Sequence, residues 1–486
     1  MKGAPPRGPR LVETRSHGVN PTALDRPRVL IGLFVVTATG LMLFGGTLGS
    51  CGILILAVGL AYLLYRRFPV TYVSFVWWLF FLVCFARRVI DYHSGYSDQN
   101  VILATPLLAA MVCVPALFEQ RMLWKLPIAL PFVLGFASAL YGLGVGVLCI
   151  PAKTLLVSTI GWFAPLIFGF FILSEFLDRE RREAHIHSLS RTFCWGILIM
   201  GAYGIYQYVV APAWDVLWMN DSAMGSIGSP EPFAIRVFST MNAPGPFAYA
   251  IVAGLLLVLC RRGLLSAVAG ALGVGALLLT SVRAAWAALA IGLILFLIRE
   301  SKYRARALLA ISLVGVCIAV AFAFPPARQT IQDRLQSFTD LHDDASYQDR
   351  TSGYSEMLPY AEDSPFGSGL GTMDAKFQDD TSLGTRDSGI WEILLSLGWI
   401  GGAVQFIALG LLVFRAWPWG EDSTPLETAA ACISIGLLSQ MALGSVNMGV
   451  TGLTIWSFGA VAMARFGPLE SPSRKGAPWI PDPAAA

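Results

Sequence analysis

The sequence predicts an all-α polytopic membrane protein of about 14 transmembrane helices (12 to 14) with one large, partly helical loop on the outer side. The chain is 55% hydrophobic and only 13% charged, whereas soluble domains carry about 25% charged residues. Apolar runs of ~18 or more residues recur along it, as membrane-crossing helices require. Basic residues cluster in alternate connections, as they do on the cytoplasmic side of membrane proteins.

The apolar runs define the expected spans in order. We expect them at 29–46, 48–65, 69–86, 99–118, 126–149, 153–177, 191–211, 240–260, 263–280, 283–299, 304–324, 388–414, 425–444 and 449–466. The stretches 29–65 and 263–299 are too long for one helix, because about 35 residues at 1.5 Å each extend ~52 Å against a ~30 Å hydrocarbon core. Each is expected to fold back as a tight hairpin of short helices or to contain a break.

The domain organisation follows from these spans. We expect a tail at 1–28, a bundle of about 11 spans at 29–324, a large loop at 325–387, a bundle of about three spans at 388–466, and a disordered tail at 467–486. The first 28 residues lack an apolar stretch, so no cleavable signal peptide is expected.

The basic clusters orient the spans. With the N-terminus inside, the clusters at 66–67, 121–125, 179–191, 261–262 and 299–306 and Arg415 all fall inside, and losing one span would invert those that follow. Both termini are therefore expected to be cytoplasmic. The same orientation puts Arg283 at the outer tip of the 263–299 stretch.

The basic residues left on the outer face are almost all arginine. They are Arg87, Arg88, Arg236, Arg283, Arg328, Arg334, Arg350 and Arg386, with Lys153 and Lys376 as the exceptions. Arginine binds phosphate through two parallel hydrogen bonds, which lysine cannot do, so the set favours an anionic ligand. The alternative for each arginine is snorkelling to lipid headgroups or pairing with loop carboxylates.

The loop at 325–387 is acidic, with twelve Asp and Glu against five Lys and Arg. Loops of this length are usually functional or disordered. An amphipathic pattern at Tyr354, Met357, Leu358 and Ala361 predicts a short helix. The glycines of "SPFGSGLG" that follow allow positive φ and close backbone approach. The chain then returns to the membrane past Asp387 and Glu392.

Four segments together resemble the O-antigen ligase/polymerase family of bacterial membrane glycosyltransferases. They are "RVFSTMNAPGPFAYAI" at 236–251, "LLLTSVRAAWAAL" at 277–289, "RTSGYSEMLPYAEDSPFGSGLG" at 350–371 and "RDSGIWEILLSLGWIGG" at 386–402. There is one departure, because the ligases carry a functional His-Asn where this chain has Asp387-Ser388. The departure favours a polymerase of exopolysaccharide or O-antigen repeat units.

The resemblance implies a reaction at the periplasmic face of the bacterial inner membrane. A hydroxyl of an acceptor saccharide attacks the first sugar of a glycan linked to undecaprenyl pyrophosphate, and the lipid pyrophosphate leaves. Arg236, Arg283 and Arg350 match the arginine positions of the family and are expected, with Arg386, to bind the pyrophosphate. No metal or other cofactor is expected, because these arginines supply the positive charge.

The acceptor hydroxyl needs a base. Asp387 is the first candidate, Glu392 the second and Asp349 the third, although Asp387 also fits a helix N-cap. Three aromatic residues are candidates for stacking on sugar rings, namely Tyr347, Tyr354 and Trp391, but interfacial aromatics are common without a ligand.

Two other functions stay open. A ligase of the same family would move the glycan to a lipid or protein acceptor. A secondary transporter or flippase would be expected to show internal repeats and mid-membrane charges, and no repeat relates the halves of this chain. Besides the lipid-linked oligosaccharide and membrane lipids, a chain-length regulator and a flippase are candidate partners, and no nucleic acid is expected.

Overall fold

The computed structural model describes residues 27–300, 357–377, 388–417 and 423–466, except for 99, 223, 225 and 226, together with single positions at 312, 315 and 354. Regular structure in this part of the chain is helical, apart from one isolated bridge between Gly228 and Ile235. The helices are α1 (Pro27–Phe44), α2 (Gly46–Arg67), α3 (Pro69–Ser94), α4 (Thr105–Met111), α5 (Pro115–Glu119), α6 (Leu130–Cys149), α7 (Ala152–Leu177), α8 (Arg179–Val210), α9 (Ala213–Asp221), α10 (Pro244–Val258), α11 (Leu264–Leu279), α12 (Arg283–Arg299), α16 (Thr372–Phe377), α17 (Gly389–Ala416), α18 (Pro425–Leu438) and α19 (Gly449–Met463). The predicted all-α class is confirmed for these residues.

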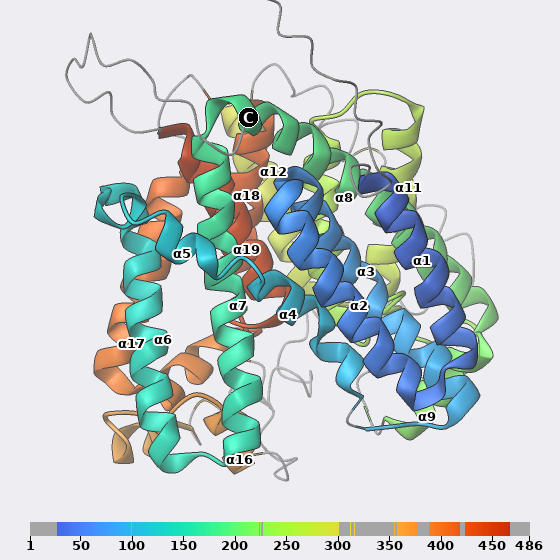
Figure 1. Cartoon of the computed structure of the whole chain (residues 1–486), viewed down its shortest axis with the longest axis horizontal. Helices are drawn as coiled ribbons and strands as arrows, with labels where there is room; N and C mark the ends of the chain where they lie inside the picture. The colour runs from blue at the N-terminus through green and yellow to red at the C-terminus, as the bar shows by residue number, and fades with distance from the viewer. Residues whose placement is uncertain are drawn as a thin grey trace, which may run out of the picture.

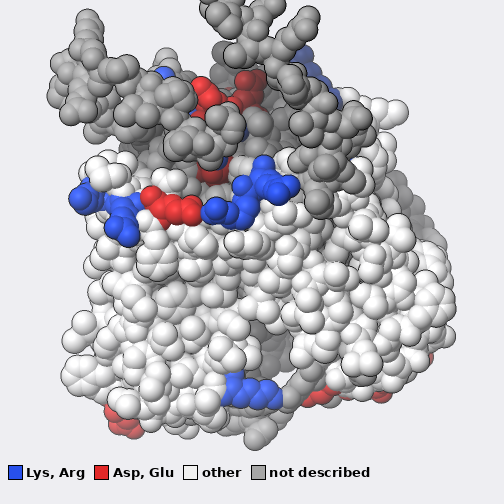
Figure 2. Space-filling model, in the orientation of Figure 1, with Lys and Arg blue, Asp and Glu red and all other residues white. Residues whose placement is uncertain are grey.

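The molecule has the composition and charge distribution of a membrane protein. Among the described residues, eight helical segments are long and apolar enough to cross a membrane, and α10, α11, α18 and α19 are shorter apolar helices. Figure 2 shows charged side chains near the upper and lower edges of the viewed face, with a broad uncharged zone between them. The total of 14 spans stays a prediction, since the expected span at 304–324 lies almost entirely outside the described residues.

Both over-long apolar stretches are broken, as predicted. α1 and α2 pack along each other, and the chain turns between them at Gly46, which has a φ of 52°. The second break lies at 280–282, between α11 and α12. Here the hairpin is open rather than tight, because α11 packs mainly on α8 and α10 while α12 packs mainly on α18 and α10.

The core of the bundle is formed by α7, α10, α18 and α19 (Figure 1). Every residue of α19 from Val450 to Met463 is buried. On one side of this core α6 packs against α17, and on the other side α3 packs against α8. Aromatic rings fill the junction with α3, where Trp77 contacts Phe193 and Phe458.

Polar contacts group the helix ends into two faces. At one end Arg182 pairs with Glu427, and Thr428 donates to Glu300 at 2.8 Å; we name this end the Glu427 face. The turn at 280–282 lies at the other end of α12, which we name the Arg283 face. These contacts bring the connections at Arg182 and Glu300 to one face. That all the basic connections share this face, and that it is cytoplasmic, stay predictions.

Several elements differ from the expected spans, and α3, for example, ends at Ser94 rather than at 86. α8 begins at Arg179 rather than at 191, because Asp178 caps it by accepting hydrogen bonds from the N–H groups of Glu180 and Arg181. α17 covers the expected span but is interrupted at Gly398, which has a φ of 66° and a ψ of −168°.

The glycine-rich segment at 364–371 packs at this interruption. Gly367, Gly369 and Gly371 have φ values of 78°, 95° and 89°, as the sequence predicted. Ser368 and Gly369 donate backbone hydrogen bonds to the carbonyls of Leu395 and Ser396, and Leu370 N–H donates to Gly142 of α6. The segment therefore supplies donors to carbonyls near the break in α17 and joins that helix to α6.

The predicted amphipathic helix of the large loop is present over 357–363. Met357 and Ala361 are buried against Trp391 and Leu395 of α17. Leu358 was expected on the buried side, but it is exposed. The apolar stripe is narrower than predicted, because residues one position apart are separated by about 100° around a helix.

Candidate functional site

The turn that carries Arg283 is built by its own sequence motif. Thr280 Oγ1 and Trp286 Nε1 both donate to the carbonyl of Leu277, at 2.7 and 3.2 Å. Val282 N–H donates back to Thr280 Oγ1 at 3.2 Å. α12 then begins at Arg283 itself, a residue that is partly exposed.

The structure brings Arg236 to this turn. Its Nε donates to the carbonyl of Thr280 at 3.3 Å, and Nη2 donates to that of Ser281 at 3.4 Å. The backbone N–H of Val237 donates to Leu279 at 3.1 Å. Two of the four predicted pyrophosphate-binding arginines therefore meet at one three-residue turn, because Arg236 donates to its carbonyls and Arg283 directly follows it.

A third segment, the connection between α18 and α19, lies at the same level along the helix axes as the start of α12. Gly436 of α18 packs against the carbonyl of Ala288, and Gly292 packs against that of Cys432, so α12 and α18 are antiparallel. Moving from Ala288 back to Arg283 therefore corresponds to moving from Gly436 to about Met441. The connection between α18 and α19 lies beside the start of α12.

That connection also holds the start of α17. The N–H of Gly389 donates to the carbonyls of Met441 and Gly444. The N-cap position of α17 is Ser388, and Asp387, whose alternative role was a helix cap, lies outside the described residues. Tyr354 lies here too, with its hydroxyl 3.2 Å from Ser388 Oγ and donating to the carbonyl of Ala442.

Glu392 lies one turn further into α17 and is buried, with 4% of its surface exposed. Its Oε2 accepts hydrogen bonds from Ser445 Oγ at 2.7 Å and from Asn447 Nδ2 at 3.3 Å. Asn447 Oδ1 in turn accepts from Gln405 Nε2 at 2.9 Å, and Ser138 of α6 donates to Gln405 Oε1 at 2.6 Å. The buried carboxylate is thus oriented by a hydrogen-bonded chain across three elements.

Two of the three aromatic residues predicted to stack on sugar rings, Trp391 and Tyr354, are among the described residues. Trp391 is 5% exposed and packs against the ring of Tyr354 at 5.4 Å between centroids. Tyr354 is partly exposed. Sugar stacking by either residue stays a prediction.

Half of the predicted site lies outside the described residues, namely Asp349, Asp387, Arg350, Arg386 and Tyr347. In the part of the chain that the structure describes, no group of three or more His, Cys, Asp or Glu residues is placed to hold a metal ion. The expectation that no metal takes part stays a prediction.

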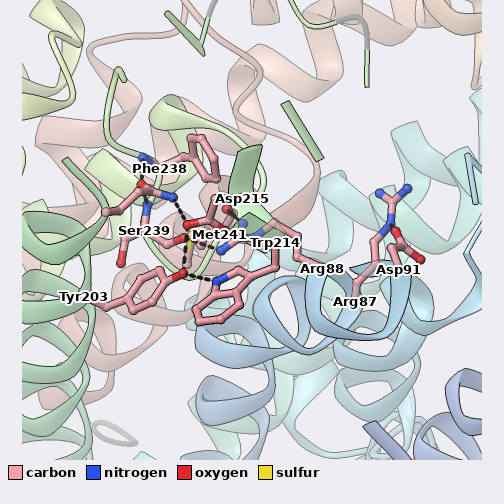
Figure 3. A network of polar contacts seen from close by, with 10 residues as sticks. Arg87, Arg88, Asp91, Tyr203, Trp214, Asp215, Phe238, Ser239 and Met241 are labelled. Atoms are coloured by element: carbon pink, nitrogen blue, oxygen red, sulfur yellow. Dashed lines mark hydrogen bonds and ion pairs between the residues drawn. The ribbon is translucent and has the colours of Figure 1, made fainter. Parts of the chain in front are cut away.

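Two arginines that were expected on the outer face are buried inside the protein and pair with carboxylates. Arg88 is fully buried and pairs with Asp215 at 2.7 Å (Figure 3). Arg87 is also buried and pairs with Asp91 at 3.1 Å. Pairing with carboxylates was the alternative reading of each outer arginine, and it holds for these two.

Several polar residues of this region were not predicted from the sequence. They are Tyr203, Gln207 and Asp215 around Arg88, and Ser138, Gln405, Ser445 and Asn447 around Glu392. An amide such as Gln405 within an apolar span was a usable signal, because a buried amide needs a hydrogen-bond partner.

Comparison with known families matches residues 268–406 to the family model described as O-Antigen ligase. The matched range holds three of the four segments that carried the resemblance, from the Arg283 turn to α17, and Arg236 precedes it. Comparison with curated proteins found no match, and neither did comparison with solved structures. The family match confirms the resemblance drawn from the sequence.

Proposed function

We propose, from the premise that residues 268–406 form a domain of the O-antigen ligase family, that this membrane protein polymerises lipid-linked oligosaccharide repeat units. The donor would be a glycan on undecaprenyl pyrophosphate, and the acceptor the end of another repeat unit. The reaction would take place on the Arg283 face, which we assign to the periplasm of the bacterial inner membrane. The observation that carries the proposal is the convergence of Arg236 on the turn that precedes Arg283.

Two arginines at one helix start suit a leaving pyrophosphate. Both side chains are partly exposed, and α12 adds the positive end of its dipole where Arg283 begins it. As the bond between the anomeric carbon and the phosphate oxygen breaks, negative charge grows on the pyrophosphate, and preorganised donors stabilise it. We propose that Arg350 and Arg386 complete this set and that no metal ion is required.

The proton of the acceptor hydroxyl must leave as the new glycosidic bond forms. Asp387 remains the first candidate for the base, since it directly precedes Ser388 at the start of α17. Glu392 is the second candidate. Because Glu392 is buried and Ser445 is partly exposed, the proton would reach Glu392 Oε2 through the Ser445 hydroxyl. Asp349 is the third.

A ligase reaction is the second candidate function, and the description of the matched family favours it. The donor chemistry is the same, and only the acceptor differs. The Asp387-Ser388 pair in place of His-Asn supports the polymerase.

The test uses the purified protein in nanodiscs with the lipid-pyrophosphate-linked repeat unit as the sole substrate, and the saccharides are separated on a gel. A ladder spaced by one repeat unit is the expected result. Transfer only after a lipid or protein acceptor is added would overturn the polymerase in favour of the ligase. Lipid-substrate binding without either product would favour a transporter.

A further inference from the structure

Arg88 connects α3 to the segment that carries Arg236. Its guanidinium donates to the carbonyls of Ser239 and Met241 and lies 4.9 Å from the centre of the Phe238 ring. Both Arg88 and its ion-pair partner Asp215 are fully buried. These contacts lie two to five residues from Arg236, or on the helix α9 that packs on α3 (Figure 3).

Gln207 of α8 holds the same segment through hydrogen bonds to its backbone N–H groups. Its Oε1 accepts from the backbone N–H groups of Phe238 and Ser239, at 3.1 and 2.8 Å. Its Nε2 donates to Asp215 Oδ2 at 2.7 Å, and Tyr203 donates to the same oxygen at 2.8 Å. The network therefore binds the N–H groups of residues 238 and 239 and the carbonyls of residues 239 and 241.

The backbone fixed in this way is strained. Ser239 has a φ of 51°, and Ser281, whose carbonyl receives the Arg236 hydrogen bond, has a φ of 54°. Positive φ at a residue with a side chain costs free energy and persists only where the surroundings enforce it. A buried ion pair is also weak support for stability alone, because apolar residues of similar size often stabilise a core as well. Strain and a buried ion pair at one segment point to a requirement for geometry.

We infer that Arg88, Asp215 and Gln207 are positioning residues that hold Arg236 beside Arg283 for a pyrophosphate ligand. The inference rests on the proposed function. The positioning role requires an arginine at position 88, not only a positive charge. The planar guanidinium of Arg88 contacts Asp215 and two carbonyls together, and a lysine ammonium does not reproduce that geometry.

The experiment measures binding of undecaprenyl pyrophosphate, without glycan, to the protein in nanodiscs for Arg88→Lys, Arg236→Ala and the double variant. Arg88→Lys keeps the positive charge opposite Asp215, so it is expected to fold, and a thermal midpoint is recorded for each variant. We expect Arg88→Lys and Arg236→Ala each to weaken binding by about tenfold, as loss of a charge-assisted hydrogen bond does. The double variant should bind no more weakly than Arg236→Ala, because residues that act through one another are not additive.

Arg87→Lys is the matched control. It lies next to Arg88 in α3 and is paired and buried, but its recorded contacts are with Asp91, Ser97 and Tyr96. Gln207→Met is a second probe that removes the acceptor for residues 238 and 239 and should also weaken binding.

The outcomes separate the two proposals. Additive losses in the double variant, or an Arg88→Lys variant with native affinity, would overturn the positioning role and leave the proposed function intact. A native protein that binds undecaprenyl pyrophosphate no better than undecaprenol would overturn the proposed function, and the positioning role with it.

Discussion

Arg236 Nε donates to the main-chain carbonyl of Thr280 at 3.3 Å, across 44 residues of sequence. The contact ties the approach to α10 to the turn between α11 and α12. Main-chain carbonyls fix the direction of a guanidinium without neutralising its charge, because they carry only partial charges. The carbonyls of Thr280 and Ser281 therefore orient Arg236 at the turn that precedes Arg283.

Replacing either arginine by alanine should severely reduce the proposed polymerisation. We expect Arg283→Ala and Arg236→Ala each to lower the rate by about 10²–10³-fold, as removal of one oxyanion donor does in other enzymes. Arg262→Ala is the matched control, since Arg262 is exposed and lies in the connection between α10 and α11. Gel quantification of repeat-unit ladders measures the effect, and native rates in both variants would exclude this arginine pair from catalysis.

Alanine at Gly398 should destabilise the junction of α17 with the large loop. A Cβ there would lie 2.3 Å from the carbonyl oxygen of Pro365, and the φ of 66° is unfavourable for alanine. We expect a loss on the order of 3 kcal/mol, seen as a lower thermal midpoint in detergent. Gly410→Ala in the same helix has no atom within 4 Å of the new Cβ, so it should keep or slightly raise the midpoint. Equal midpoints for the two variants would contradict the packing seen at Gly398.

Much of the fold was predictable because it follows from local rules. The breaks at Gly46 and at 280–282 follow from length against membrane thickness, and the positive φ values of Gly367 and Gly369 follow from the conformational freedom of glycine. The amphipathic pattern gave the helix at 357–363 but placed Leu358 wrongly, because spacing alone does not set the width of the buried stripe.

The candidate site was less predictable because its contacts join distant segments. An arginine near a span end looks the same in sequence whether it faces a ligand, as proposed for Arg283, or a carboxylate, as Arg88 does. The partner of Arg88 is on α9, and the partners of Glu392 follow α18. Such pairings depend on how helices pack, which no local pattern encodes.

Low pH should reduce the stability that Asp178 contributes at the N-terminal end of α8. Burial raises the pKa of Asp178, but the hydrogen bond and charge of Arg181 and the N–H donors of the helix lower it more, so the net pKa lies below its usual value. A carboxyl with a lowered folded-state pKa contributes stability above its unfolded pKa of about 3.9, and this contribution is lost as the pH falls through the folded value.

Asp178→Ala should therefore cost about 1 kcal/mol near neutral pH, as loss of an N-cap does, and the difference from the native protein should shrink below about pH 4. Asp178→Asn keeps a capping oxygen without the charge and should lie between the two. Thermal midpoints measured across this pH range test the prediction, and a difference that grows in acid would contradict it.

The variant Glu392→Gln distinguishes a catalytic role of the buried carboxylate from a structural one. The amide fits the same space and keeps one oxygen to accept from Ser445 and Asn447, so the thermal midpoint should change little. If Glu392 takes the acceptor proton, polymerisation should fall by about 10²-fold or more, and Ser445→Ala should lower it in the same direction. Asn447→Leu is the contrasting variant, because it removes one hydrogen bond from Gln405 Nε2 and one from the buried carboxylate, and it should lower stability by about 1–3 kcal/mol. An active Glu392→Gln beside an inactive Asp387→Asn would assign the base to Asp387 and leave Glu392 a purely structural role.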